Sequence, residues 1–131
     1  MTGTCWLCLG CNHETAVGLS QARSLLTELF PDIRFGTEQR TAPIDFPNSS
    51  PFVNQVACFH TTRPIVDILP ELKDIEHACG RREEEKKEGI VRMDIDLLQY
   101  GSTVLKPQDM EYVHVKKGMK ELLFHADTIH V

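Results

Sequence analysis

The chain has 131 residues, 41% hydrophobic and 25% charged, values within the usual range for one compact domain, 1–131. Its formal net charge of −5 leaves no basic field to attract nucleic acid, although a few local cations can still hold a nucleotide. No stretch reaches the roughly 20 apolar residues that cross a bilayer, and no basic-then-apolar leader opens the chain, so we expect a cytoplasmic protein without a membrane partner.

Five cysteines, an odd number in a chain without an export signal, do not suggest a disulfide framework. The spacing of the first three is similar to that of an iron–sulfur or zinc site, but no fourth cysteine follows at the expected distance. On a strand, Cys5 and Cys11 would also point away from Cys8. We therefore expect reduced thiols that serve as small core residues.

The first predicted element is a buried strand at 4–10, where an apolar run ends at a glycine. Apolar residues then recur every three or four positions from Ala16 to Phe30, which predicts an amphipathic helix that Pro31 ends. Arg23 is the one polar interruption of the stripe that this spacing forms.

Two further strands are predicted at 33–41 and 52–61, on either side of a long loop at 42–51 that contains three prolines. A second helix is expected to begin near Thr62 and to continue until Gly80, with its apolar residues facing the core.

Pro70 should kink this second helix, because proline removes a backbone donor and crowds the preceding turn. The dense charge run at 81–90 lacks apolar anchors, which indicates a mobile loop. Residues 91–100 alternate and predict another strand, whereas 102–131 have only weak helical spacing. This order predicts an α+β fold, a ferredoxin-like βαββαβ sandwich with an antiparallel sheet and both helices on one face.

Asp94 and Asp96 are alternate residues of the last predicted strand, so their carboxylates should face the same way, roughly 7 Å apart. Two buried like charges repel unless a cation lies between them, and magnesium is often held by one or two carboxylates plus phosphate oxygens. An exposed strand face with two solvated aspartates is the alternative that this pair alone leaves open.

Histidine and arginine side chains are candidate phosphate contacts. His114 stands near the end of a plausible strand, where a lone histidine is more often structural or solvated. Arginine suits bidentate phosphate contacts, yet most arginines are surface charges. Four arginines are ambiguous for this reason: Arg40, Arg81, Arg82 and Arg92.

Six motifs together resemble one known family in order and spacing, from about Leu7 to Gly101. They are Leu9-Gly10-Cys11-Asn12, Arg40-Thr41-Ala42-Pro43, Phe52-Val53-Asn54, Ile75-Glu76, Gly80-Arg81 and Asp94-Ile95-Asp96-Leu97-Leu98-Gln99-Tyr100-Gly101. The chain resembles the 6-hydroxymethyl-7,8-dihydropterin pyrophosphokinases of folate biosynthesis, which transfer pyrophosphate from ATP to the pterin and release AMP. The resemblance implies two Mg²⁺ ions, ATP as co-substrate, active-site loops at 42–51 and 81–90, and a monomer or weak homodimer.

The resemblance also implies roles for individual residues. Asp94 and Asp96 would bind both magnesium ions and, with Arg81 and His114, would be the catalytic residues. The pterin would be bound by Thr41, Ala42, Pro43, Ile44, Phe52 and Asn54. ATP would be contacted by Glu76, Arg81, Arg82, Arg92 and His114.

The chain departs from the family pattern on the ATP side. Val91 stands where the family has an arginine, and Glu83 stands where it has a second loop arginine. Arg92 would point to the opposite face from Val91, whereas Arg82 is able to shift toward the vacated role.

The C-terminal part departs as well, and 102–131 is expected to be a divergent, shortened tail. The family's histidine-proline segment, followed by arginine and phenylalanine, is reduced to 113–115 with Lys120 and Leu122, so one pterin-stacking wall is missing. Two hypotheses follow: an active, magnesium-dependent pyrophosphokinase, whose activity these departures could reduce, or a catalytically impaired pterin-binding or protein-interaction module. An RNA-binding domain of the same topology would need exposed aromatics and a basic surface, which the sequence does not favour.

Overall fold

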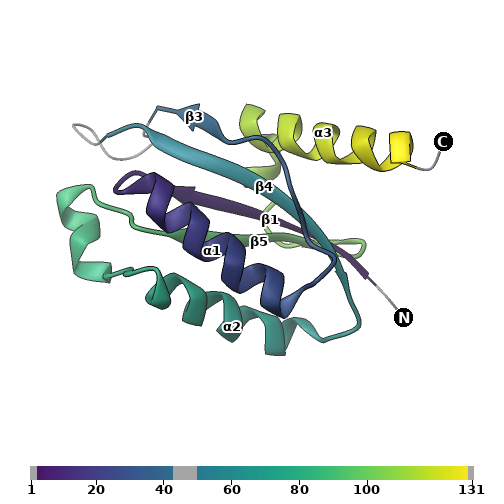
Figure 1. The fold of residues 1–131 in the computed structure, drawn as a ribbon, viewed down its shortest axis with the longest axis horizontal. Helices are drawn as coiled ribbons and strands as arrows, with labels where there is room; N and C mark the ends of the chain where they lie inside the picture. Colours follow the sequence, from purple (N-terminus) through teal and green to yellow (C-terminus); the bar gives the residue numbers. More distant parts are fainter. Residues whose placement is uncertain (1–2, 43–49, 130–131) are drawn as a thin grey trace.

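An antiparallel sheet of six strands organises the computed structural model, which describes residues 3–42 and 50–129 (Figure 1). The strand order is β2-β4-β1-β5-β6, and β3 also pairs with β4. The strands are β1 Gly3–Cys11, β2 Arg34–Phe35, β3 Gln39–Thr41, β4 Phe52–Thr61, β5 Asp94–Tyr100 and β6 Thr103–Val104. Every pairing is antiparallel, so the predicted α+β, ferredoxin-like arrangement is confirmed.

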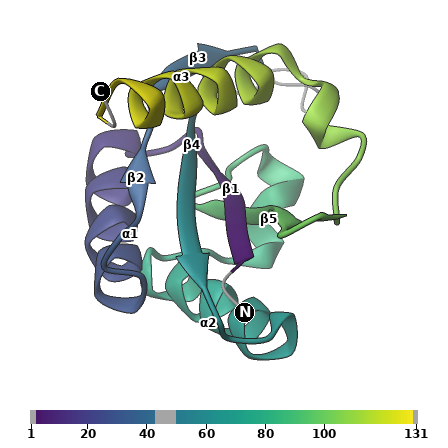
Figure 2. The same cartoon turned by 90° about the vertical axis from the view of Figure 1, so that its right-hand side faces the viewer.

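Helices cover both faces of this sheet (Figure 2). The helices are α1 Thr15–Leu29, α2 Ile65–Ala78 and α3 Val113–Ile129, and two short 3-10 helices are η1 Glu83–Glu88 and η2 Asp109–Glu111. The two helices predicted from periodicity, α1 and α2, lie on one face as expected, and α3 packs on the other against β4. The described helices include no candidate for a membrane span.

Two hydrophobic cores result from the alternation of side chains along the central strands. In β1, Leu7 and Leu9 pack toward α1 and α2, whereas Trp6 and Cys8 pack toward α3. All five cysteines are free, and burial raises the pKa of Cys8 to about 12. The expectation that cysteines serve as small core residues is therefore confirmed at the four buried positions, Cys5, Cys8, Cys11 and Cys58.

The single strand predicted at 33–41 is wrong, because the structure has two short strands there. Between β2 and β3 the chain forms hydrogen bonds with α3 as well as with β4. The backbone N–H of Gly36 donates to Val56 O at 2.8 Å, while the N–H and hydroxyl of Thr37 both donate to the carboxylate of Glu121 on α3. Helix α3 thus takes hydrogen bonds from a segment that would otherwise have continued its pairing with β4.

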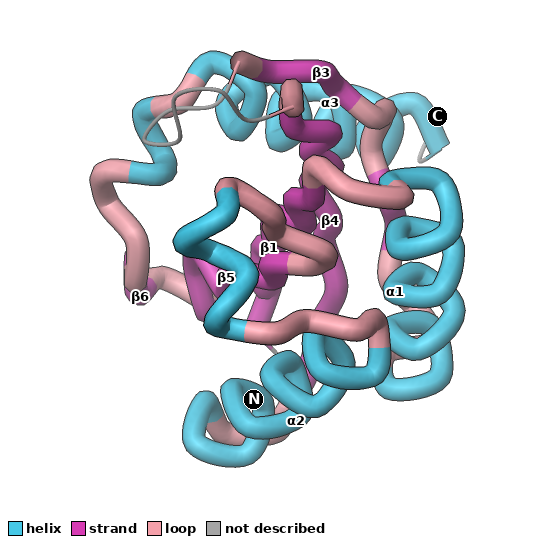
Figure 3. Tube along the Cα trace, turned by 90° about the vertical axis from the view of Figure 1, so that its left-hand side faces the viewer, coloured by secondary structure: helices cyan, strands magenta, loops and turns pink. Residues whose placement is uncertain are grey.

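The segment predicted as a loop at 81–90 contains η1, and the strand predicted from Val91 begins only at Asp94. Buried Asn12 accounts for the late start, because its backbone N–H donates to Val91 O and its Oδ1 accepts the Val91 N–H. Its Nδ2 also donates to Gly89 O at 2.7 Å. Figure 3 shows η1 and the turn after β1 side by side at one end of the sheet.

Helix α3 approaches the sheet very closely at Gly118. A Cβ added there would lie 2.4 Å from Cγ2 of Val56, a fully buried β-branched residue with little freedom to move. Gly118→Ala should therefore destabilise the protein by about 1–3 kcal/mol, even though alanine is the better helix former. Urea unfolding would measure the change.

The matched control for this prediction is Lys117→Ala, an exposed position on the same helix. Its free energy of unfolding should stay within about 0.5 kcal/mol of the wild type. Equal stability of Gly118→Ala and the control would mean that α3 does not pack this closely.

Candidate functional site

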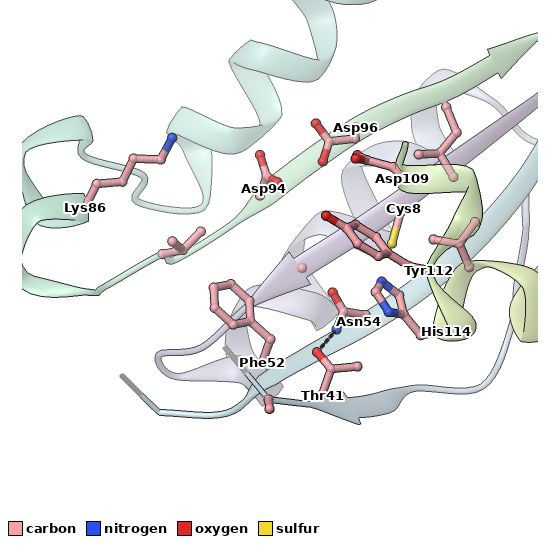
Figure 4. Close-up of a pocket in the computed structure, with 15 residues that line it drawn as sticks. Cys8, Thr41, Phe52, Asn54, Lys86, Asp94, Asp96, Asp109, Tyr112 and His114 are labelled. Carbon is pink, nitrogen blue, oxygen red and sulfur yellow. Dashed lines mark hydrogen bonds between the residues drawn. The ribbon is translucent and has the colours of Figure 1, made fainter. Parts of the chain in front are cut away.

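A cavity of about 300 Å³ opens on the side of the sheet that α3 partly covers (Figure 4). Its walls come from β1, β3, β4, β5, the η1 segment and the chain from η2 into α3. The lining residues are Cys8, Gly10, Thr41, Ala42, Phe52, Asn54, Lys86, Val91, Asp94, Asp96, Leu98, Asp109, Tyr112, His114 and Val115. Segments distant in sequence thus meet around one space.

The two aspartates of β5 both line this cavity, as their alternation predicts. Asp94 pairs with Gly10 and Asp96 with Cys8 on the central strand β1, so a rigid ladder sets their spacing. Ile95 between them is buried in the core on the opposite face. If β5 slipped by one residue against β1, Ile95 would leave the core and the two carboxylates would enter it. Burial of Ile95 therefore stabilises the observed register.

The charges of the pair are poorly compensated. Burial, and next the charge of Asp94, raise the pKa of Asp96 to about 7, while Lys106 lies 3.9 Å away and only partly offsets this. Asp94 has a closer partner, because Nη1 of Arg81 donates to its Oδ1 at 2.9 Å. A cation bound between the carboxylates would relieve the repulsion that burial makes costly.

Arg81 and Glu76 lie behind the pair. Arg81 also donates to Met93 O at 3.2 Å and lies 3.5 Å from Oε2 of Glu76. That same Oε2 accepts the backbone N–H of Ile95 at 2.7 Å. Desolvation raises the pKa of Glu76, which is 4% exposed. The glutamate therefore ties α2 to β5 and positions both Arg81 and the strand.

The opposite wall is amide and aromatic in character. Nδ2 of Asn54 donates to Oγ1 of Thr41 at 2.6 Å, and Phe52 lies two residues earlier on the same strand. Gly10 leaves room beside the amide, because a Cβ there would lie 3.0 Å from Oδ1 of Asn54. Ala42 also lines the cavity, whereas Pro43 and Ile44 lie outside the described residues.

His114 lies in the first turn of α3, so the strand predicted around it is wrong. Its ring stacks on Tyr112 with centroids 5.5 Å apart, and burial lowers its pKa. Its carbonyl oxygen accepts a hydrogen bond from Nε2 of Gln39 on β3 at 2.8 Å. In Figure 4 the imidazole lies beside Asn54 rather than beside the two aspartates.

Three lining residues had no sequence signal: Lys86, Asp109 and Tyr112. They belong to segments without regular apolar spacing, and only the packing of η1, η2 and α3 brings them to the cavity. Tyr112 adds an aromatic side chain to the wall of the cavity, where its ring stacks on His114.

None of the four candidate arginines lines the cavity, although Arg81 reaches Asp94 from behind the pair. Arg82 pairs with Glu84 at 3.2 Å, and Arg92 makes a two-point pair with Glu85 at 2.9 and 3.1 Å. Val91 does line the cavity, so Arg92 points away from it as predicted. Arg40 belongs to a different hollow, between β3 and α3.

A second hollow lies on the other side of the aspartates, between α2 and the β5–β6 hairpin. Its lining is largely apolar: Val66, Leu69, Pro70, Leu72, Ile95, Leu97 and Leu105, with Lys73, Glu76 and Lys106. Asp94 and Asp96 line this groove as well as the cavity. The carboxylate pair thus lies where a polar-aromatic cavity and an apolar groove meet.

The donor set fits magnesium rather than a transition metal. The described residues contain no cluster of three or more histidine, cysteine, aspartate or glutamate side chains able to hold a metal. Two carboxylates alone suit magnesium, which commonly takes its remaining ligands from water and phosphate.

Comparison with known families agrees with this geometry. Residues 6–123 match the sequence profile of the 7,8-dihydro-6-hydroxymethylpterin-pyrophosphokinase family, a stretch that contains every residue lining the cavity. A comparison with curated proteins gives no match.

Proposed function

We propose, because the chain belongs to the 7,8-dihydro-6-hydroxymethylpterin-pyrophosphokinase family, that it transfers pyrophosphate from ATP to 6-hydroxymethyl-7,8-dihydropterin in folate synthesis. The observation that carries the proposal is the aspartate pair at the junction of a polar-aromatic cavity and an apolar groove. In the reaction, the pterin hydroxymethyl oxygen bonds to the β-phosphorus. The bond from that phosphorus to the oxygen bridging to the α-phosphate breaks, AMP leaves, and the hydroxyl proton passes to solvent.

In this proposal the cavity binds the pterin and the apolar groove binds the adenine of ATP. The flat pterin would occupy the cavity, with its polar edge at Asn54 and Thr41 and its faces between Phe52 and Tyr112. The adenine would occupy the apolar groove beside Leu69, so that the triphosphate crosses the aspartates toward the pterin. Such placement accounts for much of phosphoryl-transfer catalysis, which depends on positioning and charge neutralisation.

Asp94 and Asp96 would hold magnesium, two ions if the family pattern applies throughout. When bound, magnesium neutralises phosphate charge and lowers the proton affinity of a coordinated hydroxyl group. Arg81 would steady Asp94 and present its remaining N–H groups to phosphate oxygens, and Glu76 would orient Arg81 through their 3.5 Å ion pair. His114 and Tyr112 would close the cavity from the α3 side.

The direct test is an assay of the purified protein with ATP, magnesium and 6-hydroxymethyl-7,8-dihydropterin, followed by measurement of AMP. Stoichiometric AMP and pterin diphosphate would support the enzyme. Pterin binding without AMP would favour the second hypothesis, an impaired binding module. That hypothesis draws support from Val91 in the cavity and from the pairing of Arg82 and Arg92 with glutamates.

Asn54 offers a test of the pterin side. Asn54→Ala should weaken pterin binding by about 1–3 kcal/mol, because a buried polar edge of the ligand would lose its partner. Isothermal titration with the pterin measures this loss, and the affinity for an ATP analogue in the same variant is the internal control. Unchanged pterin affinity would place the pterin elsewhere.

A further inference from the structure

The cavity contains more negative than positive charge. Three aspartates line it, Asp94, Asp96 and Asp109, whereas Lys86 is the one lysine or arginine among its described lining residues. The proposed ligand adds the phosphates of ATP to this negative charge. Cationic side chains that reach the terminal phosphates therefore matter more here than in a balanced site.

The neighbouring arginines are already engaged by carboxylates. Arg81 has Glu76, Glu83 and Asp94 within 3.5 Å, and the guanidinium of Arg92 is paired with Glu85. No ion pair between described residues involves Lys86. Among the residues that the structure describes, Lys86 thus offers this wall of the cavity an ammonium group that is not paired with a carboxylate.

The residues on either side of Lys86 make contacts that tie η1 to the rest of the fold. Glu85, one residue earlier, makes its two-point pair with Arg92, and Gly89, three residues later, accepts the hydrogen bond from Asn12. In Figure 4 Lys86 lies at the edge of the cavity, with its ammonium group at the end of the side chain nearer Asp94. The side chain itself is exposed and is able to reach toward a ligand.

We infer that Lys86 contacts the terminal phosphates of bound ATP and takes the role that an arginine at position 91 would have filled. The inference rests on the proposed function, which brings the transferred pyrophosphate to the cavity side of Asp94. The lysine approaches from η1, whereas Val91 lies on the segment that leads into β5. The charge would therefore reach the phosphates from a different part of the chain.

The test compares Lys86→Met with Lys87→Met, because both lysines are exposed but only Lys86 lines the cavity. The ligands, titrated with magnesium present, are an ATP analogue with a methylene between the α- and β-phosphorus, and AMP. Lys86→Met should weaken analogue binding roughly tenfold and leave AMP binding unchanged, because only the analogue has the terminal phosphates. Lys86→Arg should keep most of the affinity, and Lys87→Met should match the wild type.

The outcomes separate this inference from the proposed function. If the wild type binds the analogue and Lys86→Met binds it equally well, the lysine has no phosphate contact and the proposed function still stands. A similar loss from Lys87→Met would indicate a general surface-charge effect and overturn the inference. A wild type that binds neither the analogue nor AMP would overturn the nucleotide site itself, and the role of the lysine with it.

Discussion

Replacing either aspartate of β5 by asparagine should lower the rate of AMP formation at least about a thousandfold, while pterin affinity changes by less than about threefold. Asparagine keeps the shape of the side chain but removes the charge that would hold magnesium against the triphosphate. A thousandfold loss corresponds to about 4 kcal/mol of the activation barrier, within what a bound metal ion contributes. Steady-state kinetics of Asp94→Asn and Asp96→Asn, with titration of the pterin, would measure both quantities.

Asp109→Asn is the matched control, because Asp109 lines the same cavity but lies outside the pair on β5. Its rate should fall by less than about tenfold. Comparable losses at all three positions would indicate that the cavity needs negative charge in general, and would remove the argument for a magnesium pair.

The metal-free Asp96→Asn variant should be more stable than the wild type at pH 8. Burial raises the folded-state pKa of Asp96 from 3.8 to about 7, so the folded protein binds this proton more tightly than the unfolded chain does. Well below pH 3.8 the carboxyl group is protonated in both states and does not lower the free energy of unfolding. As the pH rises from 3.8 to about 7, the group lowers that free energy progressively, because it ionises more readily in the unfolded chain. Asparagine should recover as much as about 4 kcal/mol of unfolding free energy at pH 8.

Urea unfolding in the presence of a chelator, at several pH values, would test this prediction. The advantage of the variant should shrink as the pH falls, and magnesium should stabilise the wild type more than the variant. The control is Asp74→Asn, an exposed position on α2, which should show no such dependence on pH. Lower stability of Asp96→Asn at pH 8 would mean that the carboxylate is better compensated than its surroundings indicate.

Local sequence patterns were sufficient for the elements near the aspartate pair. Asp94 and Asp96 share a face because successive side chains of a strand alternate, a property of the backbone that needs no knowledge of the rest of the fold. The spacing of α1 and α2 likewise follows from periodic burial against one sheet face. The order of these elements was enough to predict the ferredoxin-like topology, since it allows few ways to pair the strands.

Long-range contacts decided the features that the patterns missed. The strand predicted at 33–41 is divided because Glu121, more than eighty residues later, takes the backbone and hydroxyl of Thr37. β5 starts late because Asn12 bonds the backbone of Val91. Each case is a competition for backbone groups that is invisible within a window of neighbouring residues.

Motifs and periods of a few residues were enough to predict the family, the order of elements and the common direction of the two carboxylates. The other side chains of the cavity were placed by the packing of distant elements. Tyr112 and Lys86 reach the cavity because α3 packs against Val56 through Gly118 and because η1 is tied to Asn12. Contacts of this kind depend on the space between elements, and the physical fit of one side chain against another is not encoded in any local pattern.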